Sequence, residues 1–316
     1  MRFDELGLDA DILRSLEAMN FEEMTPVQEH TIPIILENKD LIGCAQTGTG
    51  KTAAYTLPLL DKLLREGNPD NVVKSLIVVP TRELAQQIDV QFQGFSYFLP
   101  LSTTVVYGGG DGIGWEQQKQ GMLRGSDIVV ATPGRLLAHI ANSGIDLSHV
   151  SYFVLDEADR MLDMGFIHDI KRILPLLPKE RQTLFFSATM PSDIVTLANS
   201  MLHDPVHVTV TPPASVVETI SQSVMFAEKA EKKDLLISLL RERSEGSVLV
   251  FSRTKHGADR IARILTKAGI EGRAIHGDKS QGARERAMND FRAGRCRVLI
   301  ATDIAARGID ISELPL

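Results

Sequence analysis

Short runs of mainly apolar, β-branched residues recur along the chain, and longer stretches with a helical pattern separate them. The runs lie at 75–80, 102–109, 127–133, 151–159, 183–189, 247–253 and 297–303. Apolar runs of this length are typical of buried strands in parallel sheets, because helices cover both faces of such sheets. The pattern therefore predicts an α/β fold with parallel sheets flanked by helices.

The predicted strands share a further feature, which is the small, polar or charged cluster that follows most of them. In open α/β sheets, ligands bind at the carboxyl ends of the strands. We therefore expect the chemically important side chains to lie in these clusters.

The strand and helix pattern is interrupted once, at 207–217, where the sequence reads HVTVTPPASVV. Its Pro-Pro pair can neither continue a helix nor sit inside a sheet. A chain of 316 residues is also long enough for two domains. We therefore predict a first domain at 1–210, a linker at 211–217 and a smaller second domain at 218–316.

The composition excludes several classes of protein. With 43% hydrophobic and 24% charged residues, the chain is neither disordered nor collagen-like. It has no run of about 18 apolar residues, and its start is acidic and amphipathic, so we expect neither a membrane span nor a secretory signal. Cys44 and Cys296 belong to no CxxC pattern, which favours a cytoplasmic location. The histidines form no HExxH pattern, so a dedicated protein-ligated metal site has no support.

Charge is distributed unevenly along the chain. The formal net charge is −7, but the segment from 241 to 307 holds twelve Arg and three Lys against eight acidic residues. Such a basic segment is typical of a nucleic-acid-binding surface or of a solvated Arg-rich face. Charge alone leaves both interpretations open.

The strongest local motif is AQTGTGKT, which follows the apolar segment DLIGC and precedes a predicted helix. A strand, a glycine loop and a helix form the context that a phosphate-binding loop requires. Gly48 and Gly50 allow backbone N–H groups to face phosphate oxygens, Lys51 can reach the β- and γ-phosphates, and the Thr52 hydroxyl can bind Mg²⁺. The strict pattern has glycine where this chain has Ala45, so an ordinary glycine turn remains an alternative for the motif taken alone.

A second motif follows the predicted strand at 152–155, where the chain reads Asp156-Glu157-Ala158-Asp159. Carboxylates at a strand end beside a phosphate loop can hold Mg²⁺ and orient an attacking water. We assign the metal to Asp156 and the water to Glu157. An acidic tetrapeptide by itself is more often a capped helix start, so this assignment depends on the glycine loop.

The glycine-rich segment at 108–114 does not have the GxGxxG pattern of a dinucleotide-binding turn, and we interpret it as a flexible turn. Trp115 follows it and is the sole tryptophan. A packed anchor is the favoured role for this side chain, and a platform for a nucleic-acid base is the alternative.

Taken in order, the motifs of the chain resemble those of DEAD-box ATP-dependent RNA helicases over nearly the whole length. The resemblance implies two RecA-like domains, of which the second is incomplete, and ATP, Mg²⁺ and RNA as ligands. It implies catalytic roles for Lys51, Asp156, Glu157, Ser187 and Thr189, with Thr52 and Asp156 at the metal. It implies nucleotide contacts from Phe21, Thr25, Gln28, Ala45, Gln46, Thr47, Gly48, Thr49, Gly50, Lys51, Thr52, Gly308 and Asp310.

The same resemblance implies RNA-backbone contacts from both domains. In the first domain these are Pro80, Thr81, Arg82, Gly109, Thr132, Pro133, Gly134 and Arg135, and in the second Arg253, His276, Gly277, Thr302, Asp303 and Arg307. Hydroxyls, backbone N–H groups and single arginines at strand ends suit phosphate and sugar oxygens and read no base edge. The resemblance therefore implies sequence-independent binding of single-stranded RNA and local separation of short duplexes. It also implies a monomer that acts on ribonucleoprotein or ribosome-assembly partners.

The chain departs from the family pattern at its end. The family has a His-Arg-x-x-Arg-x-x-Arg motif after the position of Asp310, whereas this sequence ends at Leu316. Arginines that reach the γ-phosphate contribute about 10³–10⁵ to the rate of phosphoryl transfer, so we expect impaired hydrolysis in this chain. Two alternatives to a helicase stay open, an ATP-gated RNA clamp without turnover and a DNA translocase of the wider helicase superfamily.

Overall fold

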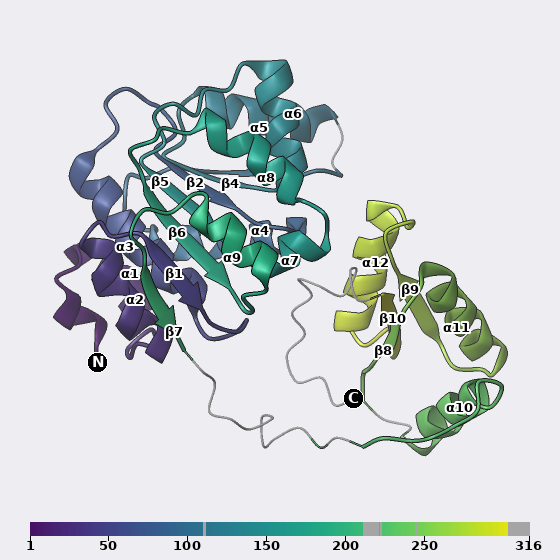
Figure 1. The fold of residues 1–316 in the computed structure, drawn as a ribbon. Coiled ribbons are helices and arrows are strands. Elements are labelled where there is room, and N and C mark those ends of the chain that lie inside the picture. The colour runs from purple at the N-terminus through teal and green to yellow at the C-terminus, as the bar shows by residue number, and fades with distance from the viewer. Residues whose placement is uncertain (110–111, 211–220, 222, 244–245, 303–316) are drawn as a thin grey trace. The chain divides into compact units, whose positions relative to one another are not determined.

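The computed structural model describes residues 1–109, 112–210, 221, 223–243 and 246–302. The chain divides into two compact units, Met1–Ser215 (unit 1) and Val216–Leu316 (unit 2). Each unit is built on its own parallel sheet (Figure 1). The α/β prediction, with two parallel sheets flanked by helices, is therefore confirmed. The predicted linker at 211–217 lies outside the described residues.

Unit 1 contains a seven-stranded sheet in the order β3-β4-β2-β5-β6-β1-β7, and every neighbouring pair is parallel. The strands are β1 (Leu41–Cys44), β2 (Ser75–Val78), β3 (Thr103–Val106), β4 (Ile128–Ala131), β5 (Tyr152–Leu155), β6 (Gln182–Ser187) and β7 (Val206–Thr209). Strands β2 to β6 are shorter than the apolar runs that predicted them, because the polar ends of those runs form the loops at the carboxyl edge. β1 is the apolar segment before the glycine loop, and β7 was not predicted, because it lies largely in the segment 207–217 where the strand pattern breaks.

Helices cover both faces of this sheet (Figure 1). One face packs against α1 (Ala10–Ala18), α2 (Pro26–Leu36), α3 (Lys51–Glu66) and α4 (Arg82–Phe95). The other packs against α5 (Gly112–Leu123), α6 (Pro133–Ser143), α7 (Ala158–Asp163), α8 (Ile167–Ile173) and α9 (Ser192–Asn199). Short 3₁₀ helices lie at Phe3–Leu6 and Leu174–Leu176.

Strand residues alternate between the two hydrophobic cores of unit 1. Ile77 and Val154 are fully buried in the core with α1–α4, and their neighbours Val78 and Leu155 are fully buried in the opposite core. Successive side chains of a strand point to opposite faces, so a strand between two helical layers needs apolar residues at every position. This requirement explains the continuous apolar runs in the sequence.

Unit 2 has a three-stranded parallel sheet in the order β8-β10-β9 within its described residues. The strands are β8 (Val248–Ser252), β9 (Gly272–Ile275) and β10 (Val298–Thr302). Helices α10 (Lys232–Glu242) and α11 (Lys255–Lys267) pack in one core, and α12 (Gln281–Arg292) packs in the other. Both faces of this smaller sheet are therefore covered by helices.

The amino-terminal edge of the unit 1 sheet is held by the buried carboxylate of Asp40. Its Oδ1 accepts a hydrogen bond from the backbone N–H of Thr183 at 2.7 Å, and its Oδ2 accepts one from the N–H of His203 at 2.7 Å. These bonds connect the residue before β1 to the start of β6 and to the loop before β7. The sheet order therefore depends on a side chain as well as on backbone pairing.

We expect Asp40→Ala to lower the free energy of unfolding of unit 1 by about 2–4 kcal/mol, because it leaves the buried N–H of Thr183 and the partly buried N–H of His203 without an acceptor. Trp115 is the sole tryptophan and lies in unit 1, so urea unfolding followed by its fluorescence reports on this unit. Glu37→Ala is the control, since Glu37 is exposed and pairs with Lys39 at the surface. Equal shifts in the two variants would contradict the role given to Asp40.

Candidate functional site

The predicted phosphate loop connects β1 to α3. Gly48 and Gly50 both have positive φ, at 82° and 91°. Backbone of this kind is strained for residues with a Cβ atom, so glycine is required at these turns. Gly50 caps the N-terminus of α3, and Lys51 is the first helical residue. The loop thus ends at the positive end of a helix that is 16 residues long.

Gln28 holds this loop from α2. Its Nε2 donates to the carbonyl of Gly50 at 3.1 Å, and its Oε1 accepts from the N–H of Thr25 at 2.9 Å. A Cβ atom on Gly50 would lie 2.5 Å from Gln28 Nε2. The predicted nucleotide residues Gln28 and Thr25 therefore contact the phosphate loop itself.

Lys51 and Asp156 bring together the two central motifs. Their Nζ and Oδ1 atoms are 3.9 Å apart, and both side chains are nearly fully buried. Lys51 Nζ has no hydrogen-bond partner in the described part of the chain. A buried ammonium without such partners is costly, so this position is suited to an anionic ligand.

Asp156 is fixed by two neighbours. Its Oδ2 accepts from the Tyr55 hydroxyl at 3.1 Å, and its Oδ1 accepts from the N–H of Glu157 at 2.8 Å. Burial and the charge of Asp156 raise the pKa of Tyr55, so its hydroxyl stays protonated and remains a donor. The carboxylate is thereby oriented beside the phosphate loop.

Glu157 has an unusual backbone conformation for a residue with a side chain. Its φ and ψ are 53° and 48°, in the left-handed region. Its Oε2 lies 2.6 Å from Arg160 Nη1. Burial and the neighbouring Asp156 raise the pKa of Glu157. Strained backbone together with a perturbed carboxyl group is typical of functional sites.

Asp159 connects the acidic motif to the loop after β6. Its Oδ2 accepts from both the N–H and the Oγ1 of Thr189, each at 2.9 Å. Its own N–H donates to Ser187 Oγ at 3.2 Å, and that hydroxyl donates to the carbonyl of Thr189. Hydrogen bonds from Asp159 therefore connect the acidic motif to the 187–189 loop.

Phe21, the predicted adenine-stacking residue, is half-buried and packs edge-on against Phe95 with 5.3 Å between ring centroids. It lies at the margin of the core formed by α1–α4. The ring is therefore fixed in place by protein contacts on one side.

The predicted RNA residues of unit 1 follow β2, β3 and β4. Thr81 caps α4 through its Oγ1, Pro133 is the first residue of α6, and Gly109 has a φ of 88°. The guanidinium of Arg82 lies 4.6 Å above the ring of Tyr107. Pro80, Thr132, Gly134 and Arg135 occupy the same carboxyl edge of the sheet.

Trp115 forms a stack with two other side chains. Its ring lies 3.8 Å from that of His139 at an interplanar angle of 21°, and the guanidinium of Arg135 lies 5.1 Å from its centroid. His139 Nε2 is 3.2 Å from Gln118 Oε1, and Gln118 Nε2 donates to the carbonyl of Tyr107. Trp115 is thus a packed anchor that supports Arg135, as the sequence analysis favoured.

The predicted RNA residues of unit 2 follow its three strands. Arg253 comes after β8 and is exposed, Gly277 is exposed after β9, and Thr302 ends β10. The His276 side chain is buried, and its Nε2 lies 3.1 Å from Asp259 Oδ2. Asp303, Arg307, Gly308 and Asp310 lie outside the described residues.

Sequence reasoning missed three side chains that surround the predicted ones. Tyr55 bonds to Asp156, Arg160 pairs with Glu157, and Asp159 was read as part of a motif without a separate role. Arg160 follows Glu157 by three residues, a spacing that places both on one helical face and could have revealed the pair. Tyr55 gave no comparable signal.

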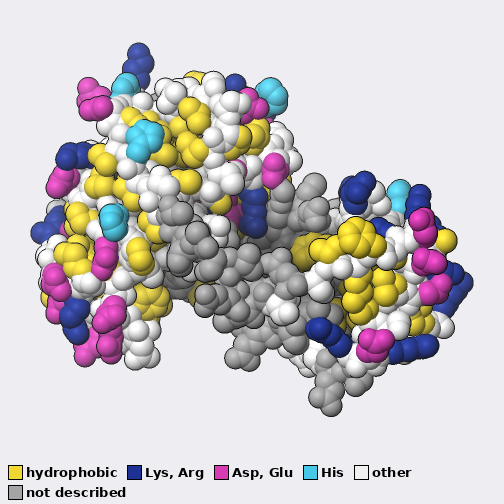
Figure 2. Space-filling model, turned by 60° about the horizontal axis from the view of Figure 1, so that its bottom comes forward, with side chains coloured by type: hydrophobic (Ala, Val, Ile, Leu, Met, Phe, Trp, Pro, Cys, Tyr) yellow, Lys and Arg dark blue, Asp and Glu magenta, His cyan; other side chains and the backbone are white. Residues whose placement is uncertain are grey.

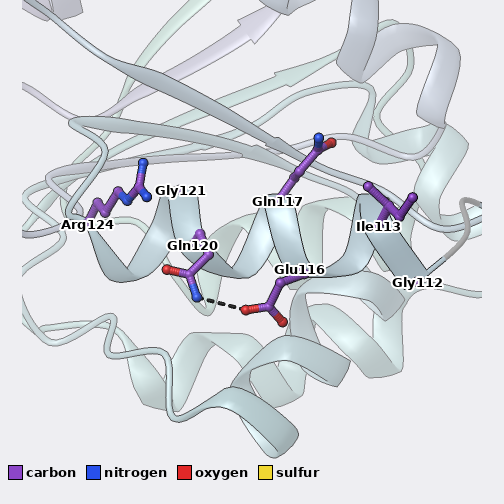
Figure 3. A pocket seen from close by; sticks show the side chains of 7 residues that line it. All are labelled: Gly112, Ile113, Glu116, Gln117, Gln120, Gly121 and Arg124. Atoms are coloured by element: carbon purple, nitrogen blue, oxygen red, sulfur yellow. Dashed lines mark hydrogen bonds between the residues drawn. The ribbon is translucent and has the colours of Figure 1, made fainter.

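A groove of about 660 Å³ lies elsewhere, along the outer face of α5. Figure 3 shows that its lining side chains come from this single helix, with Gln120 bonded to Glu116. The lining residues are Gly112, Ile113, Glu116, Gln117, Gln120, Gly121 and Arg124. None of the predicted site residues is among them.

Fold and site together define an α/β nucleotide-binding protein with an acidic strand end beside its phosphate loop. Residues 25–197 match the model of DEAD/DEAH box helicases, and residues 231–316 match the helicase conserved C-terminal domain. The chain belongs to the DEAD/DEAH box helicase family.

Among its relatives is the ATP-dependent RNA helicase CshA of Listeria monocytogenes, at 44% identity over 98% of this chain and 59% of that protein. The DEAD-box ATP-dependent RNA helicase CshA of Geobacillus kaustophilus is 42% identical over 98% of the chain and 65% of its own length. The chain thus spans less than two thirds of these relatives.

The chain is also similar to the crystal structure of a DEAD box protein from Methanococcus jannaschii, with a TM-score of 0.62 and 37% identity. That similarity covers 99% of this chain and 83% of the other. The prediction of two RecA-like domains in a bacterial DEAD-box helicase is confirmed. In the described part of the chain, no helix has the length and apolar character needed to cross a membrane.

The stack around Trp115 predicts a pH dependence of stability. Burial and the charge of Arg135 lower the pKa of His139 from 6.5 to about 4. Between pH 4 and 6.5 the unfolded chain therefore binds a proton that the folded chain excludes, so stability falls as the pH is lowered through this range. We expect a shallower fall of the urea midpoint, measured by Trp115 fluorescence, in His139→Gln.

His149→Gln is the matched control, because His149 is exposed in the same unit. We expect it to retain the pH dependence of the wild type. A His139→Gln variant with the wild-type dependence would show that the buried imidazole does not titrate as described.

Proposed function

We propose that this chain is the ATP-binding and RNA-binding part of an RNA helicase. It binds ATP at the loop 45–52, binds single-stranded RNA by its backbone, and couples nucleotide turnover to the local separation of short duplexes. The family membership supports the general activity. The CshA relatives carry the name of ATP-dependent RNA helicases, which supports RNA as the nucleic acid.

The observation that carries the proposal is the buried Lys51 ammonium without a hydrogen-bond partner in the described residues. It lies at the start of α3 beside a loop whose glycines can turn N–H groups inward. A triphosphate supplies the acceptors that this ammonium lacks. The donor set therefore fits a nucleotide.

The same position fits Mg²⁺, which prefers oxygen ligands and is held by few protein groups together with phosphate oxygens. The Asp156 carboxylate and the Thr52 hydroxyl are the residues that would hold it. A bound Mg²⁺ supplies charge stabilisation for the transferred phosphoryl group.

Glu157 orients the attacking water and accepts its proton. Its raised pKa brings the carboxyl group nearer to neutral pH, which suits a general base. Its pairing with Arg160 and its left-handed backbone hold the side chain in one orientation. The residue is thus positioned before the nucleotide arrives.

Coupling to RNA proceeds through Asp159 and the 187–189 loop. Asp159 accepts a hydrogen bond from Thr189 and donates one to Ser187, which provides a direct path between the nucleotide residues and a neighbouring strand end. The RNA contacts are Thr81, Arg82, Thr132 and Arg135 in unit 1 and Arg253, His276 and Gly277 in unit 2. We further propose that the RNA belongs to ribosomes or other ribonucleoproteins and that the protein acts in the cytoplasm.

We expect a low steady-state ATPase activity that single-stranded RNA stimulates, in keeping with the impaired hydrolysis expected from the sequence, and we expect Lys51→Ala and Glu157→Gln to reduce it by about 10²–10⁴. Glu157→Gln retains ATP binding, because the charge of Lys51 remains, whereas Lys51→Ala loses both activities. Filter binding with labelled ATP separates the two variants. An unchanged RNA-stimulated rate in Lys51→Ala would contradict the proposal.

The same assay distinguishes the alternatives. ATP-dependent RNA binding without turnover in the wild type would make the chain an ATP-gated RNA clamp. Stronger stimulation by single-stranded DNA than by RNA would assign it to the DNA translocases. Lys179→Ala is a suitable control, because Lys179 lies outside all predicted motifs.

Two glycine substitutions test the geometry of the phosphate loop. Gly48 and Gly50 share a positive φ, but a Cβ atom at Gly48 meets nothing within 4 Å, whereas one at Gly50 clashes with Gln28 and Thr25. We expect Gly50→Ala to weaken ATP binding by about 10–100-fold and Gly48→Ala by clearly less, because only the first also breaks the Gln28 bond. Isothermal titration with ATP and Mg²⁺ measures the difference. Equal losses would show that backbone strain alone accounts for the effect.

A further inference from the structure

Unit 2 carries a groove of about 870 Å³ that no predicted motif occupies. It lies along α11 and reaches Ala274 of β9, which is an edge strand of the described three-stranded sheet. Its lining residues are Asp259, Arg260, Ala262, Arg263, Ile264, Thr266, Lys267, Ala274 and Lys279. Four of these nine carry positive charge and one carries negative charge.

Three of the basic residues form a row on α11. Arg260, Arg263 and Lys267 are exposed and are spaced by three and four residues, so they share one face of the helix. The row extends about 10 Å along the helix axis. Within the described residues, none of the three has an acidic side-chain partner, and Arg263 donates only to the carbonyl of Asp259. Figure 2 shows that Lys and Arg side chains lie at the surface of this unit.

The one acidic residue of the groove does not cancel this charge. Asp259 Oδ1 lies 2.9 Å from Lys279 Nζ, and its Oδ2 lies 3.1 Å from His276 Nε2. These contacts lower the pKa of Asp259, with the Lys279 hydrogen bond as the main cause, so the carboxylate is committed to its ion pair with Lys279. The groove is therefore left with the charge of the α11 row.

Asp259 also makes the groove continuous with the predicted RNA residues. His276 is one of those residues, and it shares the carboxylate of Asp259 with Lys279, which lines the groove. The end of β9, where His276 and Gly277 lie, is thus adjacent to the groove, so a strand of RNA that contacts these two residues can continue onto the α11 row.

We propose that this groove binds the phosphate backbone of RNA beyond the motif residues, with Arg260, Arg263 and Lys267 as its phosphate contacts. The inference rests on the proposed function and extends its RNA path. The groove has no aromatic lining residue, so it lacks a surface on which bases stack. It therefore contacts backbone and not sequence. Its small side chains, Ala262, Thr266 and Ala274, leave room for a phosphate strand.

The test compares the wild-type chain with the triple variant Arg260→Gln, Arg263→Gln and Lys267→Gln. Affinity is measured by fluorescence anisotropy with labelled oligouridylates of about 8 and about 20 nucleotides, of which the first lies within and the second beyond the usual single-strand site sizes of about 4–16 nucleotides. We expect the variant to weaken binding of the longer RNA and to leave binding of the shorter one near the wild-type value. Single-strand binding loses about 0.7 in salt slope per phosphate contact, so the slope for the longer RNA falls by about 2.

The control is the variant Lys229→Gln, Lys232→Gln and Lys233→Gln, which removes the same charge from exposed positions at the start of α10. It is expected to keep the wild-type length dependence and salt slope. Circular dichroism of each variant checks that unit 2 remains folded.

The outcomes separate this inference from the function on which it rests. A wild-type chain that binds no RNA overturns the proposed function. A wild-type chain that binds RNA, with a triple variant that keeps the same affinity and slope for both lengths, overturns the groove alone. Binding of polyglutamate by the wild type, lost in the triple variant while RNA binding is unchanged, assigns the groove to an acidic protein segment and also overturns it.

Discussion

The parallel register of β5, β6 and β1 is the constraint on which the site depends. Cys44 at the end of β1 is paired with Ser187 at the end of β6, and Leu155 at the end of β5 is paired with Phe185. Three loops therefore leave the sheet at nearly the same level. Because the strands are parallel, all three leave from the same edge, and this alone brings a glycine loop, an acidic tetrapeptide and a serine–threonine loop together. A slip of one residue in any strand would turn its apolar side chains into the wrong core and displace its loop.

The buried charged groups at that edge lower the free energy of unfolding of the ligand-free protein. Lys51 and the carboxylates of Asp156 and Glu157 are all nearly buried, and the ammonium has no hydrogen-bond partner in the described residues. Burial of such groups is unfavourable unless they are paired and hydrogen-bonded. The two apolar cores of unit 1 and the bonds from Tyr55 and Arg160 offset this cost. An anionic ligand with a cation relieves it, so the same charges that destabilise the free protein favour binding.

The sequence predicted the fold class and the strand ends because both depend on local patterns. Continuous apolar runs identified the strands, and the residues after them, such as Asp156 and Thr132, lie at the carboxyl edge as expected. The exact contacts were not predictable, since they join positions far apart in sequence. Gln28 bonds to Gly50 and Tyr55 bonds to Asp156, across 22 and 101 residues. Neither pair leaves a periodic signal, because the first depends on how α2 packs beside α3 and the second on how α3 packs on β5. The His139 stack on Trp115 is of the same kind.

The negative net charge of this chain would argue against a nucleic acid as its partner. The structure gives a physical reason why this argument fails. A chain with a formal net charge of −7 has no general attraction for a polyanion. What matters is whether individual cations are neutralised. At the carboxyl edge of unit 1, the guanidinium of Arg135 lies over the ring of Trp115. An aromatic ring attracts and orients a guanidinium while leaving its charge intact, whereas a carboxylate in the same place would cancel that charge. The ring of Trp115 therefore orients the Arg135 guanidinium without cancelling its charge, and this local arrangement outweighs the negative net charge of the chain.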